Sequence, residues 1–226
     1  MTNLHFAIKN LLYEALTFDI SNSRCYDISC KIKKLRIFEK EIFNMTKFGV
    51  VVGSIRQNSL SEGVAKAIVA GLPEGSEVNF LEIANLPLYN QDLDANSPAE
   101  YEEFRAQVAA QDAIIFVTPE HNRNIPAALK NALDVASRPW GQNVWAGKPA
   151  LVASQSISGI AGTLAHHSLR QSLVFLDLQT MAQPELYINT SETSDMETGE
   201  VTNEDSKQFL ASAGAQFAEY AAKFVG

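Results

Sequence analysis

The chain has 226 residues, 46% of them hydrophobic and 19% charged, and its net charge is −8. This composition supplies one sizeable core, and the negative charge argues against nucleic acid as a partner, because phosphate backbones bind clustered Lys and Arg. No stretch is apolar for long enough to predict a membrane span, and two cysteines are too few for a disulfide framework, so we expect a cytoplasmic protein.

Residues 1–44 differ from the rest of the chain. They carry a net charge of +2 against −10 for residues 45–226, and they hold both cysteines, Cys25 and Cys30. They show no sustained hydrophobic period, and the acidic residues in their apolar part do not fit a secretory signal. We expect residues 1–44 to be a poorly ordered extension or upstream sequence from a mis-assigned start. Residues 45–226 are expected to form one domain, and the intact mass of the natively expressed protein would test the late start.

The first predicted elements after Met45 are a strand, a helix and a second strand. Residues 48–52, "FGVVV", form a continuous run without polar residues that ends in three β-branched valines, which is typical of a strand buried on both faces. Residues 60–72 have apolar positions at helical spacing, and Pro73 follows to end the helix. Residues 78–83, "VNFLEI", predict the second strand.

The middle of the chain repeats this alternation. Residues 97–111 predict a helix with Ser97 as its N-cap and Pro98 at the first helical position. Residues 113–118, "AIIFVT", predict a third strand, and Pro126 begins the helix that follows it.

The last part of the chain completes the pattern. Residues 149–154 predict a fourth strand and residues 162–177 a helix, and a fifth strand is predicted to be broken around Pro184. After a polar loop at 189–202, Asn203 is expected to cap a final helix.

Strands that alternate with helices at this spacing predict right-handed βαβ units and one parallel sheet. The expected fold class is α/β, a doubly wound five-stranded parallel sheet of order 2-1-3-4-5 in a three-layer sandwich. In that order the first, third and fourth strands are neighbours. Ligands bind such sheets outside the carboxyl ends of the strands, so the three loops that follow these strands are predicted to form one crevice.

The loop after the first strand, "GSIRQNS", leads directly into a helix, whose first N–H groups and positive dipole end favour an anion. The loop and the start of the helix offer neutral hydrogen-bond donors and one guanidinium group: Ser54, Arg56, Asn58, Ser59 and Ser61. These groups suit a small phosphate monoester. The loop has neither the G-x-G-x-x-G pattern of dinucleotide folds nor the G-K-[ST] of nucleotide triphosphatases. A simpler alternative stays open, in which the serines and Asn58 only cap the helix and Arg56 is solvated.

Four segments together resemble the NAD(P)H-dependent FMN reductase family, the flavodoxin-like proteins that include quinone, chromate and azo-dye reductases. The segments are "GSIRQNSLS", "LPLYNQDLD", "TPEHNRNIPAALKNALDVASR" and "SGIAGT", and the resemblance covers about residues 46–188. It implies bound FMN, NADPH or NADH as the electron donor, and a quinone, a flavin or a metal oxyanion as the small-molecule acceptor. It also implies a homodimer or homotetramer.

The resemblance implies a phosphate loop, a segment whose backbone N–H groups bind the isoalloxazine ring, and a glycine near the cofactor. The residues concerned are Ser54, Arg56, Ser59, Ser61, Pro119, Glu120, His121, Asn122 and Gly159. The family often has Asn where Ser61 stands and usually has Tyr where His121 stands. His121 is flat but polar and titratable, which bears on flavin affinity and acceptor preference. Glu120 is expected to shape the turn or contact another subunit, because hydride transfer to flavin needs no protein base.

Other candidate residues have structural interpretations. Lys130, Asn131 and Asp134 are expected on a helix surface, with salt bridges between subunits. His166 and His167 are adjacent, so they are expected on different faces and are not expected to bind a metal.

Trp140 and Trp145 are expected at a subunit interface rather than over the flavin edge. Gly162 is expected near the cofactor, where glycine permits close approach or a positive φ.

The sequence therefore predicts an FMN-dependent NAD(P)H oxidoreductase that works by a ping-pong mechanism, with flavin-mediated transfer and no catalytic side chain. One alternative is a flavodoxin-type electron carrier, which the acidic charge also suits. A weaker alternative is a degenerate family member with a structural or regulatory role.

Overall fold

The computed structural model describes residues 46–224. The predicted N-terminal extension, with Cys25 and Cys30, lies outside these residues, so the expectation for residues 1–44 stays a prediction. No helix in residues 46–224 is long and apolar enough to cross a membrane.

A parallel sheet forms the middle of the molecule. Its strands are β1 (Lys47–Val52), β2 (Glu77–Phe80), β3 (Ala113–Pro119), β4 (Pro149–Ser156), β5 (Gln179–Thr180) and β6 (Leu186–Asn189). The order is β2-β1-β3-β4-β5, which confirms the predicted 2-1-3-4-5, and every pairing is parallel. The broken fifth strand is also confirmed, because β5 and β6 pair in succession with β4. Pro184 lies between them and has no N–H for the ladder.

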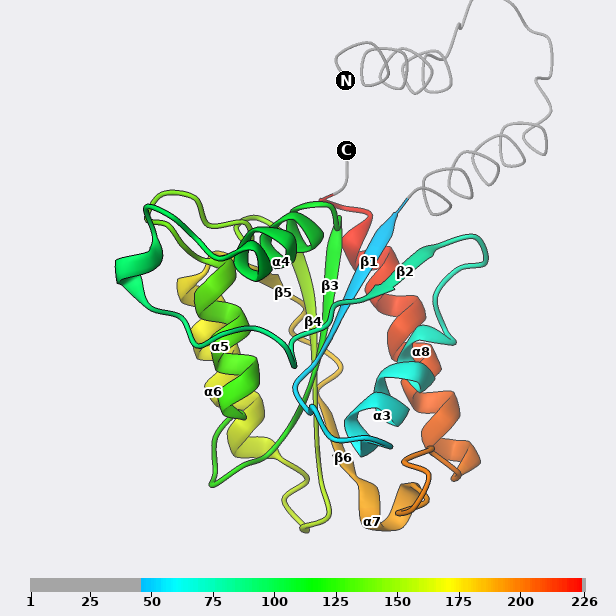
Figure 1. Cartoon of the computed structure of the whole chain (residues 1–226). Helices are drawn as coiled ribbons and strands as arrows, with labels where there is room; N and C mark the ends of the chain where they lie inside the picture. Colours follow the sequence, from blue (N-terminus) through cyan, green and yellow to red (C-terminus); the bar gives the residue numbers. More distant parts are fainter. Residues whose placement is uncertain (1–45, 225–226) are drawn as a thin grey trace, which may run out of the picture.

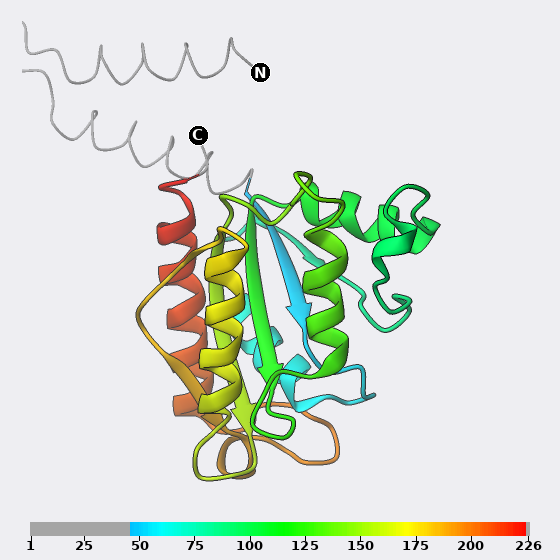
Figure 2. The same ribbon diagram turned by 90° about the vertical axis from the view of Figure 1, so that its left-hand side faces the viewer.

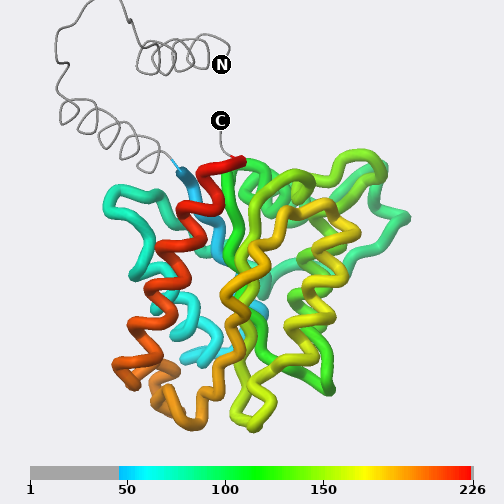
Figure 3. Tube along the Cα trace, turned by 180° about the vertical axis from the view of Figure 1, so that it is seen from behind, coloured from blue at the N-terminus to red at the C-terminus, as the bar shows by residue number. Residues whose placement is uncertain are grey.

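Helices cover both faces of the sheet and complete the three-layer sandwich. The five covering helices are α3 (Leu60–Val69), α4 (Ala99–Ala109), α5 (Ala127–Ala136), α6 (Thr163–Phe175) and α8 (Glu204–Ala221). Two shorter helices, η1 (Gln91–Leu93) and α7 (Thr190–Thr193), lie in connecting segments. Figure 1 shows α3 and α8 on one face and α4, α5 and α6 on the other. Figure 2 looks onto α5 and α6, and Figure 3 shows α8 running along the opposite face.

Alternate side chains of the central strands enter two separate cores. Phe48 and Val50 of β1 pack with α3 and α8, whereas Val51 packs with the core beneath α4, α5 and α6. All three side chains are fully buried. A β-branched strand buried on both faces was predicted from "FGVVV", and the structure confirms it.

The N-termini of two helices differ from prediction by one residue. α4 begins at Ala99, with Pro98 rather than Ser97 at the cap, and α5 begins at Ala127 after Pro126. Both prolines have extended ψ values, 152° and 151°, so neither is the first helical residue. The N-cap predicted at Asn203 is confirmed, because its side chain accepts a hydrogen bond from the Ser206 N–H.

Trp145 does not lie at an interface or over a flavin edge, and this expectation was wrong. Its side chain is fully buried, and its ring centroid lies 5.5 Å from that of Phe116 and 6.2 Å from that of Phe104. Its Nε1 donates to the Leu133 carbonyl at 3.2 Å, which removes the cost of burying the indole N–H. Trp140 is 80% exposed, so its place at an interface stays a prediction.

Asn131 is not on the helix surface, as was expected. It is buried, its Oδ1 accepts from the Tyr89 N–H at 2.8 Å, and its Nδ2 donates to the Pro87 carbonyl at 2.9 Å. Asn131 therefore fixes the long segment before α4 onto α5. Lys130 and Asp134 are on the surface, but they pair with each other within α5 at 2.7 Å.

Candidate functional site

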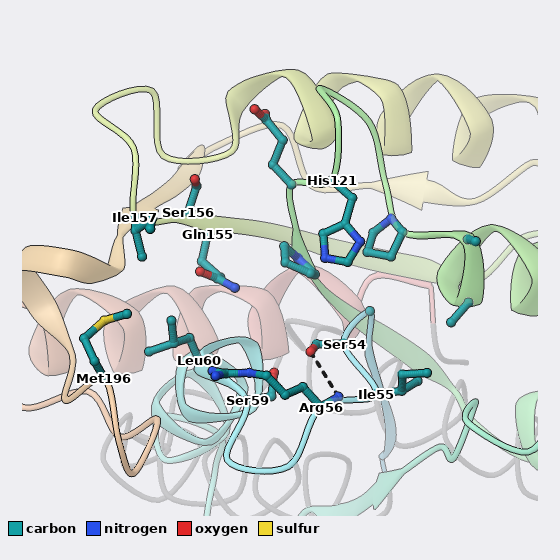
Figure 4. A pocket seen from close by; sticks show the side chains of 16 residues that line it. Ser54, Ile55, Arg56, Ser59, Leu60, His121, Gln155, Ser156, Ile157 and Met196 are labelled. Atoms are coloured by element: carbon teal, nitrogen blue, oxygen red, sulfur yellow. Dashed lines mark hydrogen bonds between the residues drawn. The ribbon is translucent and has the colours of Figure 1, made fainter.

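A cavity of about 590 Å³ opens at the carboxyl ends of β1, β3 and β4. Its walls come from all three loops that the sheet order predicted to converge, and its volume is typical of small-molecule sites, which span roughly 300–1,000 Å³. Six of the predicted residues line it: Ser54, Arg56, Ser59, Pro119, Glu120 and His121. Figure 4 shows His121 across the cavity from Ser54 and Arg56.

The other three predicted residues are not in the cavity wall. Ser61 is fully buried, and its hydroxyl accepts a hydrogen bond from Gln155 Nε2 at 2.9 Å. Asn122 is exposed at a turn, with φ of 49°. A Cβ at Gly159 would have no atom within 4 Å, so no close approach of protein atoms requires glycine there.

Ser59 has a side chain whose hydrogen-bonding capacity is not used within the protein. It is the N-cap of α3, and its carbonyl accepts from the Glu62 and Gly63 N–H groups, but its side chain makes no cap hydrogen bond. The hydroxyl Oγ is buried and has no hydrogen-bond partner. A buried hydroxyl without a partner is costly, and this one lies in a cavity wall at the positive end of a helix.

Arg56 supplies the positive charge of the phosphate loop, which we define as residues 53–59. Its side chain is exposed, and one guanidinium nitrogen, Nη2, donates to the Asn58 carbonyl at 3.1 Å. The backbone N–H of Arg56 donates to Ser54 Oγ at 3.4 Å, which folds the loop back on itself. Because Arg has five donors, the guanidinium keeps donors for a ligand. Ser54, Arg56 and Ser59 together fit a phosphate monoester.

His121 lies on a tight hairpin after β3, which we call the His121 hairpin (residues 120–124). The N–H of His121 donates to the Asn124 carbonyl at 2.9 Å, and the N–H of Asn124 donates back to the His121 carbonyl at 2.9 Å. Asn122 and Arg123 both have positive φ, 49° and 64°, as in a type I′ turn. Since the His121 N–H is engaged within the hairpin, it is not free to bind a ligand as the sequence suggested.

Several residues of the cavity wall were not named individually from the sequence. Gln155 and Ser156 end β4 and Ile157 follows it, in the loop that was predicted to reach the crevice. Met196 comes from the segment after α7, which was expected to be only a polar loop. That segment is folded against the phosphate loop, because Asn58 Nδ2 donates to the Glu197 carbonyl at 3.2 Å.

The glycine at position 199 was the one feature of the sequence that could have indicated the close contact between this segment and Asn58. Gly199 has φ of 79°, and a Cβ on it would lie 2.6 Å from the Asn58 carbonyl oxygen.

Gln155 joins three elements under the floor of the cavity. Its Nε2 donates to Ser61 Oγ, and its Oε1 accepts from Thr190 Oγ1 at 3.0 Å. Gln155 is itself buried and lines the cavity. The Gln155 amide therefore joins the starts of α3 and α7 to the end of β4. These hydrogen bonds fix the start of α3, which directly follows the phosphate loop.

The two adjacent histidines lie on different sides of α6, as predicted. His166 is fully buried and His167 is exposed. Burial lowers the pKa of the His166 imidazole to about 3, and the nearby Arg170 and His167 charges act in the same direction. Within residues 46–224, no group of three or more His, Cys, Asp or Glu side chains is placed to hold a metal ion.

The cavity thus has one side with hydrogen-bond donors, at Ser54, Arg56 and Ser59, and another side bounded by the His121 ring. Donors on one side and an imidazole on the other suit a planar ring that carries a phosphorylated tail.

Comparisons with known proteins agree with this geometry. Residues 46–193 match the model of the NADPH-dependent FMN reductase family. A quinone reductase from Pseudomonas putida is 44% identical over 172 residues, which are 76% of this chain and 92% of the relative. A 2-hydroxy-1,4-benzoquinone reductase from a Burkholderia species is 42% identical over 164 residues, covering 73% of this chain and 90% of the relative.

A solved structure is also similar. FerB, a flavoenzyme NAD(P)H:(acceptor) oxidoreductase from Paracoccus denitrificans, has 35% sequence identity and a TM-score of 0.72, covering 80% of this chain and 99% of that one. The chain belongs to the NADPH-dependent FMN reductase family.

Proposed function

We propose that this family member, an oxidoreductase that uses FMN and NAD(P)H, reduces quinones, flavins or metal oxyanions by a ping-pong mechanism. When bound, FMN takes two electrons and a proton from NAD(P)H and returns them to the acceptor. The protein's own part is to hold the cofactor, shape the space beside it and exclude competing contacts.

The buried, unpartnered hydroxyl of Ser59 in the cavity wall carries this proposal. A phosphate at the start of α3 would accept from this hydroxyl and from the Arg56 guanidinium, and the dipole of α3 favours its charge. No bulk positive charge is needed, which explains how a chain of net charge −8 binds an anionic cofactor.

The other side of the cavity supports the choice of reaction. The His121 ring borders the space where the flat ring is expected. We place the nicotinamide and the acceptor beside this flat ring in turn. Shared use of one space predicts that the oxidised nucleotide leaves before the acceptor enters, which is the basis for the ping-pong order.

Anaerobic titration tests the proposal. NADPH or NADH added to the FMN-loaded protein should bleach the yellow flavin band, and a quinone should restore it. Initial rates at several fixed quinone concentrations should give parallel double-reciprocal lines, whereas converging lines would contradict the ping-pong order. Protein that binds FMN but is bleached by neither nucleotide would contradict the reductase and favour a flavodoxin-type electron carrier.

A homodimer or homotetramer in the cytoplasm also remains part of the proposal. The exposed side chains of Trp140 and Phe175, 80% and 82% accessible, are apolar surface that a second copy would cover. Light scattering on the purified protein measures the oligomeric state.

A further inference from the structure

The His121 hairpin is attached to a helix that lies some forty residues further along the chain. Glu120 Oε2 accepts from the backbone N–H groups of Leu164 and Ala165, at 3.1 and 3.2 Å. Its other oxygen, Oε1, accepts from Arg123 Nη1 at 2.8 Å. The Glu120 side chain is itself only 5% exposed, whereas Leu164 and the side chain of Arg123 are exposed.

The two N–H groups that Glu120 accepts from belong to the first turn of α6, where helix N–H groups have no partner within the helix. The N-cap of α6 is Gly162, with φ of 77° and no side chain to act as a cap. Glu120 replaces that cap from another part of the chain, and its negative charge lies at the positive end of the helix dipole. The contact therefore stabilises α6 and the hairpin together.

A second contact fixes the other end of the hairpin to the same helix. Asn124 Oδ1 accepts from Ser168 Oγ at 2.5 Å and from the Ile125 N–H at 2.8 Å. The turn between Glu120 and Asn124 is thus held on α6 at both of its ends, and His121 lies between them.

The turn needs this support, because its two central residues have positive φ and neither is glycine. Non-glycine residues in this region are strained unless their surroundings hold them. A local pair of backbone hydrogen bonds closes the turn but does not fix its direction relative to the cavity. The direction is set by the contacts with α6.

We propose that Glu120 is a positioning residue: its carboxylate fixes the His121 hairpin on the N-terminus of α6 and so sets the wall against which the flavin ring lies. The inference rests on the proposed function. Both oxygens of Glu120 accept hydrogen bonds from the protein, which fits a positioning role. It acts on the cofactor through the place of His121.

Two variants separate the helix cap from the ion pair. Glu120→Gln has a single acceptor oxygen, so it cannot serve both α6 and Arg123, and its amide N–H₂ must face another donor. Arg123→Gln removes only the ion pair and leaves the cap. Because Arg123 is 62% exposed, the ion pair alone is expected to contribute little. Ser168→Ala removes the second attachment and serves as the alternative if Glu120→Gln does not fold.

Hydrogen exchange and flavin titration on the full chain test the proposal. In FMN-free protein, Glu120→Gln should speed exchange of the amides of His121, Asn124, Leu164 and Ala165 by about tenfold, while the sheet amides stay protected. It should also raise the Kd for FMN about tenfold and shift the absorption band of the bound flavin. Arg123→Gln should change the Kd by less than about twofold. Ser168→Ala should act in the same direction as Glu120→Gln but more weakly.

Three results would overturn the positioning role. One is unchanged exchange at the hairpin together with an unchanged Kd. Another is a uniform loss of protection over the whole fold with a normal flavin spectrum, which would show a purely structural carboxylate. The third is an equal effect of Arg123→Gln, which would assign the effect to the ion pair. Failure of the wild-type chain to bind FMN would instead contradict the proposed function, and the exchange rates would still test the attachment of the hairpin.

Discussion

Within residues 46–224, the side chains of Ser59 and His166 are buried without a hydrogen-bond partner, and the two residues differ in their surroundings. Ser59 Oγ lies in the wall of the cavity, at the start of α3 and beside Arg56. His166 lies in α6, and neither of its ring nitrogens has a hydrogen-bond partner. Its ring centroid is 4.7 Å from that of Tyr187 and 5.7 Å from that of His167. At Ser59 a ligand can supply the partner, and at His166 the ring is enclosed by protein.

The comparison shows that an unpaired buried group indicates function only where a cavity and a matching charge lie next to it. At Ser59 the cost of burial is removed when an anion binds. At His166 the imidazole stays neutral, and its pKa falls to about 3. Between that value and the ordinary pKa of histidine, about 6.5, the unfolded chain binds the proton and the folded chain does not. Stability is therefore expected to fall as the pH falls through this window.

The largest expected effect is on the Kd for FMN when the positive charge of Arg56 is removed. Arg56→Ala removes charge-assisted hydrogen bonds to the phosphate and should raise the Kd for FMN about 10- to 100-fold. Quenching of flavin fluorescence measures the Kd. Lys207→Ala, which removes an exposed positive charge on α8, is the matched control and should leave the Kd unchanged. Equal Kd values for the two variants would mean that Arg56 does not bind the phosphate.

The stability contributed by the region around His166 should depend on pH and not on flavin binding. His166→Leu removes the group that takes up a proton on unfolding, so it should flatten the pH dependence of stability. The wild type should lose about 2 kcal/mol more than the variant between pH 7.5 and pH 5 from this residue. Urea unfolding at both pH values measures the difference. If the two proteins lose stability equally, the imidazole is not buried as a neutral group.

Substitution of Ser59 should affect FMN binding and not the stability of the FMN-free protein, the reverse of what is expected at His166. Ser59→Ala removes a hydroxyl that has no partner in the absence of ligand, so the melting temperature without FMN should stay the same or rise. The Kd for FMN should rise about fivefold, because one hydrogen bond to the phosphate is lost. A fall in the melting temperature with an unchanged Kd would show that Ser59 serves the fold and not the cofactor.

The smallest effect is expected at Met196, which lines the cavity from the segment after α7. Met196→Ala removes an apolar contact to a ring and should raise the KM for a quinone about twofold, with the Kd for FMN nearly unchanged. Met196→Leu keeps the apolar volume and should behave like the wild type. A larger rise in the Kd for FMN than in the KM for the quinone would place Met196 on the cofactor and not on the acceptor.

The sheet and its order could be predicted because local patterns determine them. The β-branched run at 48–52 indicated a strand buried on both faces, and the strand broken at Pro184 was visible as an interrupted apolar run. Placement of three polar loops at one edge then followed from the order of the strands. The helix starts at Pro98 and Pro126 differed by one residue, because the extended ψ of each proline depends on the incoming loop.

Contacts between distant segments could not be predicted. Trp145 and Asn131 were expected on the surface, but each finds its partners in segments that only the folded chain brings near. Met196 had no periodic pattern around it and reaches the cavity because its segment is hydrogen-bonded to the phosphate loop through Asn58. The contact of Glu120 with α6 likewise depends on tertiary structure. The polar side chains at 53–59 could be named from the sequence because they follow one another closely in the chain, and their binding of a phosphate stays a prediction.

Titration of FMN-free protein with FMN and with riboflavin, which has no phosphate, tests the central claim most directly. If the serines and Arg56 bind the phosphate, the wild type should bind FMN at least about tenfold more tightly than riboflavin, and Arg56→Ala should lose most of this preference. Equal affinity of the wild type for both flavins, or a full preference for FMN retained by Arg56→Ala, would contradict the account.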